Sequence, residues 1–256
     1  MTVESEAPAG DDRGEQSERE QLWLELPPIS KDAPRRLLVF MHGEASSPER
    51  FAPVAVAWQL KFPGATALLL QAPQPVRVTL PDGATERAWR WYDAAGVSHE
   101  HAERIAEASE AAAERVRAVQ QSLDLGGERT ALIGFAQGAT VSLELLRRHP
   151  GIADIVVAYA GRLARPVRVD ERIPATVHLL HGGLDSRVPL VHSQRSLRQL
   201  DAAGARVTLD VVEDAGHGIG QELVTLGTTR VLQTVFRGRR PNPRPVDRHP
   251  PPETLQ

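Results

Sequence analysis

The sequence predicts a single-domain α/β protein with a mostly parallel central sheet and helices on both faces. Short runs rich in Val, Ile and Leu alternate with longer helical patterns, as expected when crossover helices join parallel strands. Several runs are apolar at consecutive positions, which is typical of strands covered on both faces. The chain has 256 residues, 41% of them apolar, so it is long enough to bury a sizeable core.

The strands are expected at the apolar runs. In chain order these are residues 37–41, 66–70, 130–135, 155–159, 176–181 and 207–212, with 22–26 as an additional edge strand.

Helices are expected between these strands. The segment Ser47-Pro-Glu supplies an N-cap residue and a proline at the first helical position, so a helix should begin there. An Ala/Glu/Arg-rich pattern predicts a long helix over about 98–123, and Gly126-Gly127 would stop it before the next strand. Further helices are expected after Phe135, Pro189 and Gly220.

The two ends of the chain differ in composition from its middle. The first 20 residues contain seven acids and two arginines, and residues 237–256 contain six prolines and five arginines. We therefore expect an acidic disordered tail at 1–20, one domain at 21–236 and a Pro/Arg-rich disordered tail at 237–256. No connecting segment within the domain is long enough to build a large lid.

Composition also narrows the function classes. The absence of cysteine excludes disulfides, iron–sulfur clusters, thiolate zinc sites and cysteine nucleophiles. A net charge of −3 argues against nucleic acid as a partner. With neither an 18-residue apolar window nor a basic start followed by an apolar stretch, we expect no membrane span and no secretory signal, and hence a cytoplasmic location. Oligomeric state is left open.

The segment Gly134-Phe-Ala-Gln-Gly138 carries the most informative motif. It follows a buried apolar run and precedes a helical pattern, and it has the form of a nucleophile elbow, in which a sharp turn lifts a serine oxygen out of the sheet. Both glycines are needed because a Cβ there would collide with the neighbouring strand and helix. The residue at the nucleophile position is Ala136, whose methyl group cannot attack a carbonyl.

Two further residues follow later strands. Asp185 and His217 each lie in a loop beyond a predicted strand, and an acid of this kind can orient an imidazole. Positions 136, 185 and 217 therefore occur in the order nucleophile, acid, base. Because open parallel sheets place their sites where the loops at the strand ends converge, we expect these three positions to meet.

With these motifs the chain resembles bacterial serine esterases of the phospholipase/carboxylesterase family, which have the α/β-hydrolase fold. The resemblance covers residues 37–235 and is strongest at 131–138, 178–185 and 208–217. The aromatic element Trp89-Arg-Trp-Tyr-Asp93 is similar to the family's element beside the acyl site.

The resemblance implies a role for each matching position. Asp185 would orient His217, and His217 would act as general base toward position 136. The backbone N–H groups of Gln137 and Glu44 would form the oxyanion hole. Trp91 and Tyr92 would border the acyl pocket. The ligand would be a small acyl ester or thioester, hydrolysed in the family through an acyl-enzyme, with no cofactor.

The sequence departs from the family pattern at two places. Ala136 replaces the serine, and the first loop reads His-Gly-Glu-Ala-Ser-Ser, where the family has glycine and aspartate after His-Gly-x. A carboxylate at Glu44 would repel a developing oxyanion if it pointed inward. Among other hydroxyls, Thr140 is expected to face the sheet, and Ser46 and Ser47 to lie at the pocket mouth.

The remaining histidines have simpler explanations. His42 is expected to be a structural hydrogen-bonding residue. His178 and His181 are three apart on one strand and point to opposite faces, so they do not predict a metal site. His99 and His101 open a charged helix and are expected on its solvated face.

Two hypotheses from different classes remain. The chain is either a carboxylesterase disarmed by Ala136, or a hydrolase-fold protein that binds a ligand or regulates a partner without catalysis. Restoring serine at position 136 would discriminate between them.

Overall fold

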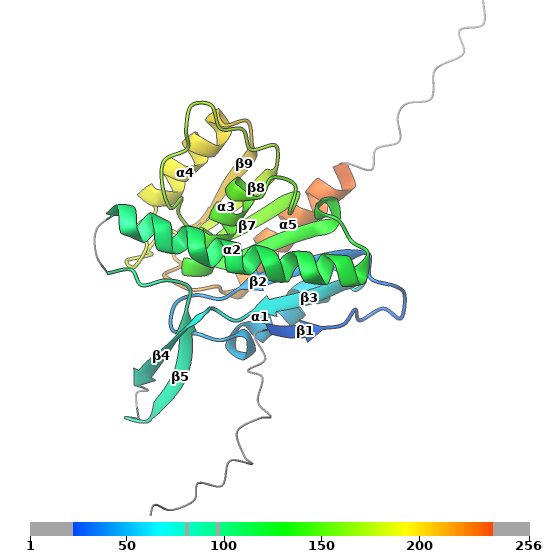
Figure 1. Ribbon diagram of the computed structural model, residues 1–256, viewed down its shortest axis with the longest axis horizontal. Helices are drawn as coiled ribbons and strands as arrows, with labels where there is room; N and C mark the ends of the chain where they lie inside the picture. The colour runs from blue at the N-terminus through cyan, green and yellow to red at the C-terminus, as the bar shows by residue number, and fades with distance from the viewer. Residues whose placement is uncertain (1–22, 80–81, 96–97, 238–256) are drawn as a thin grey trace, which may run out of the picture.

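The computed structural model describes residues 23–79, 82–95 and 98–237. The expected tail at 1–20, and all but the first residue of the expected tail at 237–256, lie outside the described residues. The described chain forms a seven-stranded sheet with helices on both faces (Figure 1), which confirms the predicted α/β class.

The sheet has the strand order β1-β3-β2-β6-β7-β8-β9. Its strands are β1 (Trp23–Leu26), β2 (Arg36–Met41), β3 (Ala65–Leu70), β6 (Thr130–Phe135), β7 (Ile155–Tyr159), β8 (Thr176–Gly182) and β9 (Arg206–Val212). All neighbours are parallel except β1, which pairs antiparallel with β3 at the edge. Each predicted strand is therefore present, with ends shifted by one residue at most.

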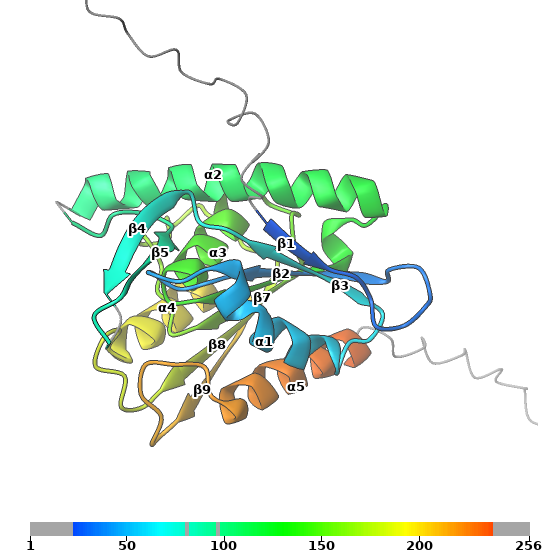
Figure 2. The same cartoon turned by 90° about the horizontal axis from the view of Figure 1, so that it is seen from below.

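Five helices cover the sheet. They are α1 (Pro48–Gln59), α2 (Ser98–Leu123), α3 (Gln137–Arg148), α4 (Val191–Ala202) and α5 (Gln221–Arg237). Seen from below, α2, α3 and α4 lie on one side of the sheet and α1 and α5 on the other (Figure 2). Ser47 caps α1 as predicted, because its hydroxyl accepts a hydrogen bond from the backbone N–H of Arg50.

Alternate residues of the central strands feed two separate cores. In β2, Leu37 and Val39 pack with the α2, α3 and α4 side, whereas Leu38 and Phe40 pack with α1 and α5. All four side chains are buried. A strand that is apolar at every position is therefore required here, because each of its faces is covered by helices.

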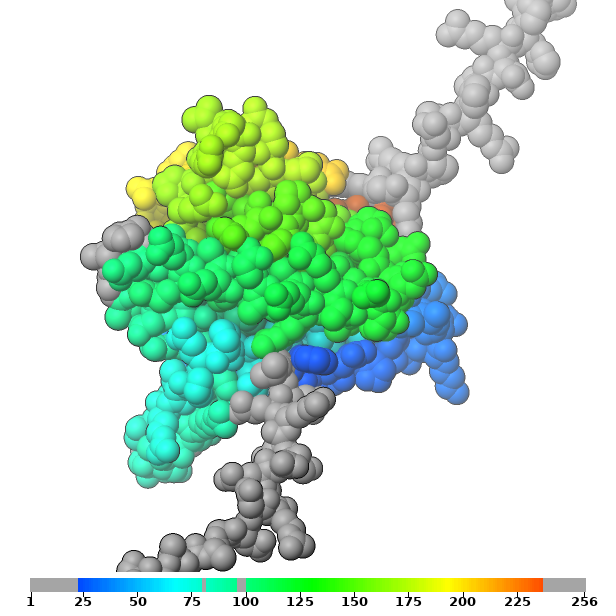
Figure 3. All heavy atoms as spheres, in the orientation of Figure 1, coloured from blue at the N-terminus to red at the C-terminus, as the bar shows by residue number. Residues whose placement is uncertain are grey.

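A two-stranded hairpin outside the main sheet was not predicted. Strands β4 (Gln74–Thr79) and β5 (Thr85–Arg90) pair antiparallel and project from the body of the molecule (Figure 3). The ion pair between Arg50 and Glu86 and the backbone bridge between Ser46 and Trp89 hold the hairpin against the loop after β2. The chain leaves the hairpin directly into Trp91 and Tyr92.

This topology brings the loops after β2, β6, β7, β8 and β9 to one edge of the sheet, since parallel strands end on the same side. Within the described ranges no helix is long and apolar enough to cross a membrane.

Candidate active site

The turn between β6 and α3 has the geometry of a nucleophile elbow. Ala136 occupies it with φ 50° and ψ −110°, a conformation that side-chain-bearing residues rarely adopt. A Cβ on Gly138 would lie 2.1 Å from the carbonyl oxygen of Met41, and one on Gly134 would lie 2.5 Å from the backbone nitrogen of Ala139. Both glycines are therefore needed for the close packing predicted from the motif.

Asp185 and His217 form a hydrogen-bonded pair. The loop after β8 carries Asp185, and the loop after β9 carries His217, whose Nδ1 donates to Asp185 Oδ2 over 2.8 Å. The second carboxylate oxygen accepts from the backbone N–H groups of Arg187 and Val188 at 2.9 and 2.8 Å. With Nδ1 protonated in this bond, the lone pair of the imidazole is on Nε2.

The environment keeps Asp185 ionised. Burial by itself raises the pKa of this carboxyl, but the hydrogen bonds from Val188, His217 and Arg187 outweigh it and hold the pKa below its usual range. An ionised Asp185 is the form that stabilises an imidazolium at His217 when that ring takes up a proton.

His217 and Ala136 line the same cavity, which has a volume of about 240 Å³. The imidazole of His217 packs on the ring of Phe135, with centroids 5.0 Å apart, and Phe135 immediately precedes Ala136. The three positions expected to meet at the sheet edge are thus brought together.

The expected oxyanion positions border this cavity as well. Gln137 is the first residue of α3, and its side chain is tied down: Oε1 accepts from the backbone N–H of Trp91 at 3.0 Å, and Nε2 donates to the carbonyl of Tyr92 at 3.2 Å. Glu44, in the loop after β2, also lines the cavity and is exposed. Backbone N–H groups at a helix N-terminus and an adjacent loop suit a developing negative charge.

The two aromatic residues differ in position. Tyr92 lines the cavity, whereas Trp91 does not. Trp91 is 1% exposed, its Nε1 donates to the carbonyl of His42 over 2.7 Å, and its ring packs on the His42 ring. The expectation that Trp91 borders the acyl pocket is therefore wrong, because its indole packs on and bonds to His42 in the loop after β2.

Several cavity residues were not predicted or were predicted elsewhere. Thr140 lines the cavity, and its hydroxyl donates to the carbonyl of Ala136 over 3.2 Å. His101 is half-buried against Tyr92, with ring centroids 5.0 Å apart, so the expected solvated position is wrong for it; the side chain of His99 lies outside the described residues. Arg162, Arg187 and His192 also line the cavity. No local motif marks these residues, because they meet only through the fold.

The other candidate hydroxyls do not reach the cavity. Ser47 is occupied as the N-cap of α1, and Ser46 pairs through its backbone with Trp89. The cavity hydroxyls are those of Tyr92 and Thr140. Burial raises the pKa of Tyr92 to about 12, so its phenol stays protonated at neutral pH and is a weak nucleophile.

The buried histidines serve the structure. His42 accepts at Nε2 from the backbone N–H of Ala72 at 3.2 Å, and burial lowers its pKa to about 4. His178 bonds to the hydroxyls of Thr208 and Thr234, and His181 bonds to Ser193. Across the described part of the chain, no cluster of three or more His, Asp or Glu side chains could hold a metal ion.

Sequence comparison identifies the family. The sequence model of the phospholipase/carboxylesterase family matches residues 29–227. The chain belongs to the phospholipase/carboxylesterase family. Among the curated members it is 30% identical, over 208 residues, to the esterase YpfH of Escherichia coli K12, covering 80% of this chain and 86% of that protein.

Solved structures agree on the fold of this family member. Esterase PE8 superposes with a TM-score of 0.72 at 24% identity, covering 82% of this chain and 97% of that one. The carboxylesterase of Bacillus cereus superposes with a TM-score of 0.67 at 17% identity, covering 82% and 93%. The chain therefore has the α/β-hydrolase fold.

Proposed function

We propose that this chain binds a small acyl ester or thioester at the cavity beside Ala136, and that it hydrolyses this ligand very slowly because the nucleophile position lacks a hydroxyl. One observation carries the proposal. The strained elbow conformation at Ala136 and the Asp185–His217 pair are both preserved around one cavity. A turn that costs of order 1–3 kcal/mol persists although the group it would present is absent.

Each residue of the site has a place in an ester-hydrolysis mechanism. A serine oxygen at position 136 would attack the ester carbonyl while His217 Nε2 takes its proton, and Asp185 would stabilise the imidazolium. The N–H groups of Gln137 and Glu44 would donate to the oxyanion of the tetrahedral intermediate. With a methyl group at 136, the acyl-enzyme cannot form, and His217 can act only on a water molecule.

The size of the defect follows from nucleophile deletions in serine hydrolases. Loss of the serine costs about 10⁶-fold in turnover, and binding plus the oxyanion hole leave about 10³- to 10⁴-fold over water. We therefore expect a wild-type rate close to background.

The second candidate is a hydrolase-fold protein that binds a ligand or regulates a partner without catalysis. It is favoured by two departures from the family pattern that occur together. The first is Ala136, and the second is the loop Glu44-Ala45-Ser46, in which Ala45 and Ser46 stand where the family has glycine and then aspartate, and Ala45 adopts φ 55°. A change confined to the nucleophile would leave this loop unaltered.

The test is the Ala136→Ser variant, assayed with 4-nitrophenyl acetate and butyrate. If the rest of the site is competent, turnover should rise by about 10⁴-fold or more over wild type, and a fluorophosphonate should label the new serine. The matched control is Ala136→Ser combined with His217→Ala, which keeps the hydroxyl and removes the base. If a folded Ala136→Ser variant shows no turnover and no labelling, the esterase proposal is refuted and the binding-protein hypothesis is left.

A further inference from the structure

The cavity beside Ala136 carries an excess of positive charge. Its ionisable lining consists of two arginines, one carboxylate, one tyrosine and three histidines: Arg162, Arg187, Glu44, Tyr92, His101, His192 and His217. Burial lowers the pKa of both His101 and His192, and the charge of Arg162 lowers it further by a smaller amount. These rings are therefore neutral at pH 7. The two arginines therefore outnumber the single carboxylate, which is exposed.

Arg162 shares the cavity lining with Tyr92, His101 and His192. Its charge also opposes, without cancelling, the effect of burial that raises the pKa of Tyr92. Those three residues come from the segment after the hairpin, from α2 and from α4. Arg162 is half-buried and lines the same cavity as these three side chains, so it forms part of the cavity wall.

Neither cavity arginine has an ion-pair partner among the described residues. Arg147 and Arg230, whose side chains are also shielded from solvent, do have such partners: Arg147 bonds to Glu171 at 2.6 Å, and Arg230 bonds to Asp210 at 2.8 Å. A partly desolvated cation is favoured when it is paired. Because Arg162 is half-buried, lines the cavity and lacks such a partner, it is a group that a ligand can satisfy.

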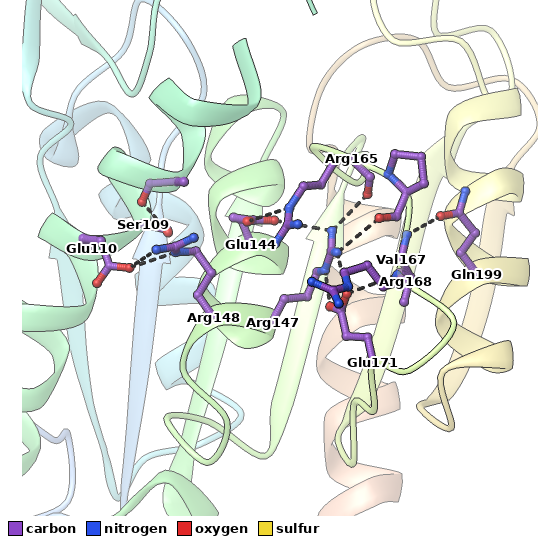
Figure 4. A network of polar contacts seen from close by, with 12 residues as sticks. Ser109, Glu110, Glu144, Arg147, Arg148, Arg165, Val167, Arg168, Glu171 and Gln199 are labelled. Atoms are coloured by element: carbon purple, nitrogen blue, oxygen red, sulfur yellow. Dashed lines mark hydrogen bonds and ion pairs between the residues drawn. The ribbon is translucent and has the colours of Figure 1, made fainter. Parts of the chain in front are cut away.

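The backbone that carries Arg162 is held in place. Arg147 donates to the carbonyl oxygens of Arg165 and Pro166 at 2.9 and 3.3 Å, and the N–H of Val167 donates to Gln199 at 2.8 Å. Figure 4 shows this network fixing the segment between β7 and β8 to α3 and α4. Closer to Arg162, the N–H of Leu163 donates to Ser196 Oγ at 3.1 Å. The arginine is therefore presented from an anchored segment.

We propose that the cavity selects esters that carry a carboxylate a few carbons from the ester carbonyl, with Arg162 binding that carboxylate and Arg187 adding positive charge at the rim. This rests on the proposed function only in naming an ester as the ligand. A planar guanidinium matches a carboxylate with two parallel hydrogen bonds. The cavity volume of about 240 Å³ limits the ligand to a short chain.

The first experiment measures binding to the chain as it stands, because Ala136 leaves the ester intact. Calorimetry would compare monomethyl adipate with methyl adipamate, which has nearly the same shape and no charge. The adipate should bind at least about tenfold more tightly, as expected for a charge-assisted pair. Arg162→Gln should remove this difference, Arg162→Lys should restore part of it, and the exposed Arg198→Gln should leave it unchanged.

Three results would each overturn the proposal. They are equal affinity for the two ligands, no measurable binding of either ligand at millimolar concentration, and an undiminished preference for the adipate in a folded Arg162→Gln variant. Kinetics of Ala136→Ser separate this failure from failure of the proposed function. If that variant cleaves 4-nitrophenyl butyrate but the Ala136 chain shows no preference for the adipate, the esterase stands and the anion selectivity does not. If the adipate binds through Arg162 and Ala136→Ser remains inactive, the anion site stands in a binding protein.

Discussion

His217 Nδ1 donates to Asp185 Oδ2 over 2.8 Å, and the same aspartate accepts two backbone N–H groups at its other oxygen. The carboxylate is therefore locked in orientation by the turn that carries it. An imidazole held in this way faces a cavity whose nucleophile position is an alanine, so the orienting part of the site is intact where the reacting part is absent.

Asp185→Asn should disable the site even when serine is present. The carbonyl oxygen of the new amide would keep the two N–H groups of the turn, and its NH₂ would face His217. The ring would then protonate on Nε2, the wrong tautomer for a general base. In the Ala136→Ser background we expect a loss of about 10⁴-fold in kcat, measured with an aryl ester. Ser186→Ala, on the exposed neighbour, is the control; a loss below about tenfold would contradict the assigned role of Asp185.

Gly138→Ala should destabilise the whole domain. The added Cβ would lie 2.1 Å from the carbonyl oxygen of Met41, a backbone atom that cannot move without displacing β2. We expect a loss of about 3 kcal/mol or more in the free energy of unfolding, the upper range for overpacking, measured by urea denaturation. Gly218→Ala, where no atom lies within 4 Å, should change stability far less. Similar values for the two variants would show that the elbow relaxes freely.

The sequence predicted those parts of the fold that are set by local pattern. The strands of the main sheet were readable because both faces are buried, as with Leu37 and Leu38. Ala136, Asp185 and His217 were found because each follows a strand and the order of the strands is encoded in the chain. The hairpin was missed because most of its residues are polar and Pro75 interrupts the first strand, a combination that does not resemble a core strand.

Residues that meet only through the fold could not be predicted in the same way. Arg162 and His101 lie in ordinary-looking segments, and nothing nearby in the sequence distinguishes them from solvated residues. Trp91 and Tyr92 are adjacent, yet one supports the β2 loop and the other lines the cavity. Which of two neighbouring aromatics faces a ligand depends on the direction of the chain after the hairpin, and this is a tertiary property.

Arg147→Met should be strongly destabilising. Arg147 and Glu144 have side chains that are each 1% exposed and lie 3.4 Å apart. Removing the cation leaves a buried carboxylate without its closest partner, at a cost of about 3–5 kcal/mol. Arg168→Met, which breaks the exposed pair with Asp170, should cost far less, because solvent screens that pair. Urea denaturation of both variants is the measurement, and equal costs would contradict the importance of burial.

The Arg147 network should also respond to acid. The hydrogen bonds from Arg147 lower the pKa of Glu171 below its usual value of 4.5. Because the folded state holds the proton less tightly than the unfolded state, this contribution is fully present above pH 4.5 and is lost as the pH falls through the folded-state pKa. Glu171→Gln should therefore flatten the decline of stability below pH 4.5, whereas Asp201→Asn on the exposed end of α4 should not. An unchanged decline in Glu171→Gln would contradict this.

Two buried histidines should make the protein less stable between pH 6.5 and about 4. Burial lowers the pKa of His42 and of His178 from 6.5 to about 4. In this window the unfolded chain binds more protons than the folded one, so stability falls as the pH decreases, by an amount of order 3 kcal/mol per histidine. Asp154 acts in the opposite sense, because burial raises its pKa to about 6 and its folded form binds the extra proton.

His178→Gln should reduce the slope of unfolding free energy against pH in this window, and Asp154→Asn should steepen it below about pH 6. Urea denaturation at half-unit pH intervals measures both slopes, and identical slopes in wild type and His178→Gln would show that His178 titrates normally in the folded protein.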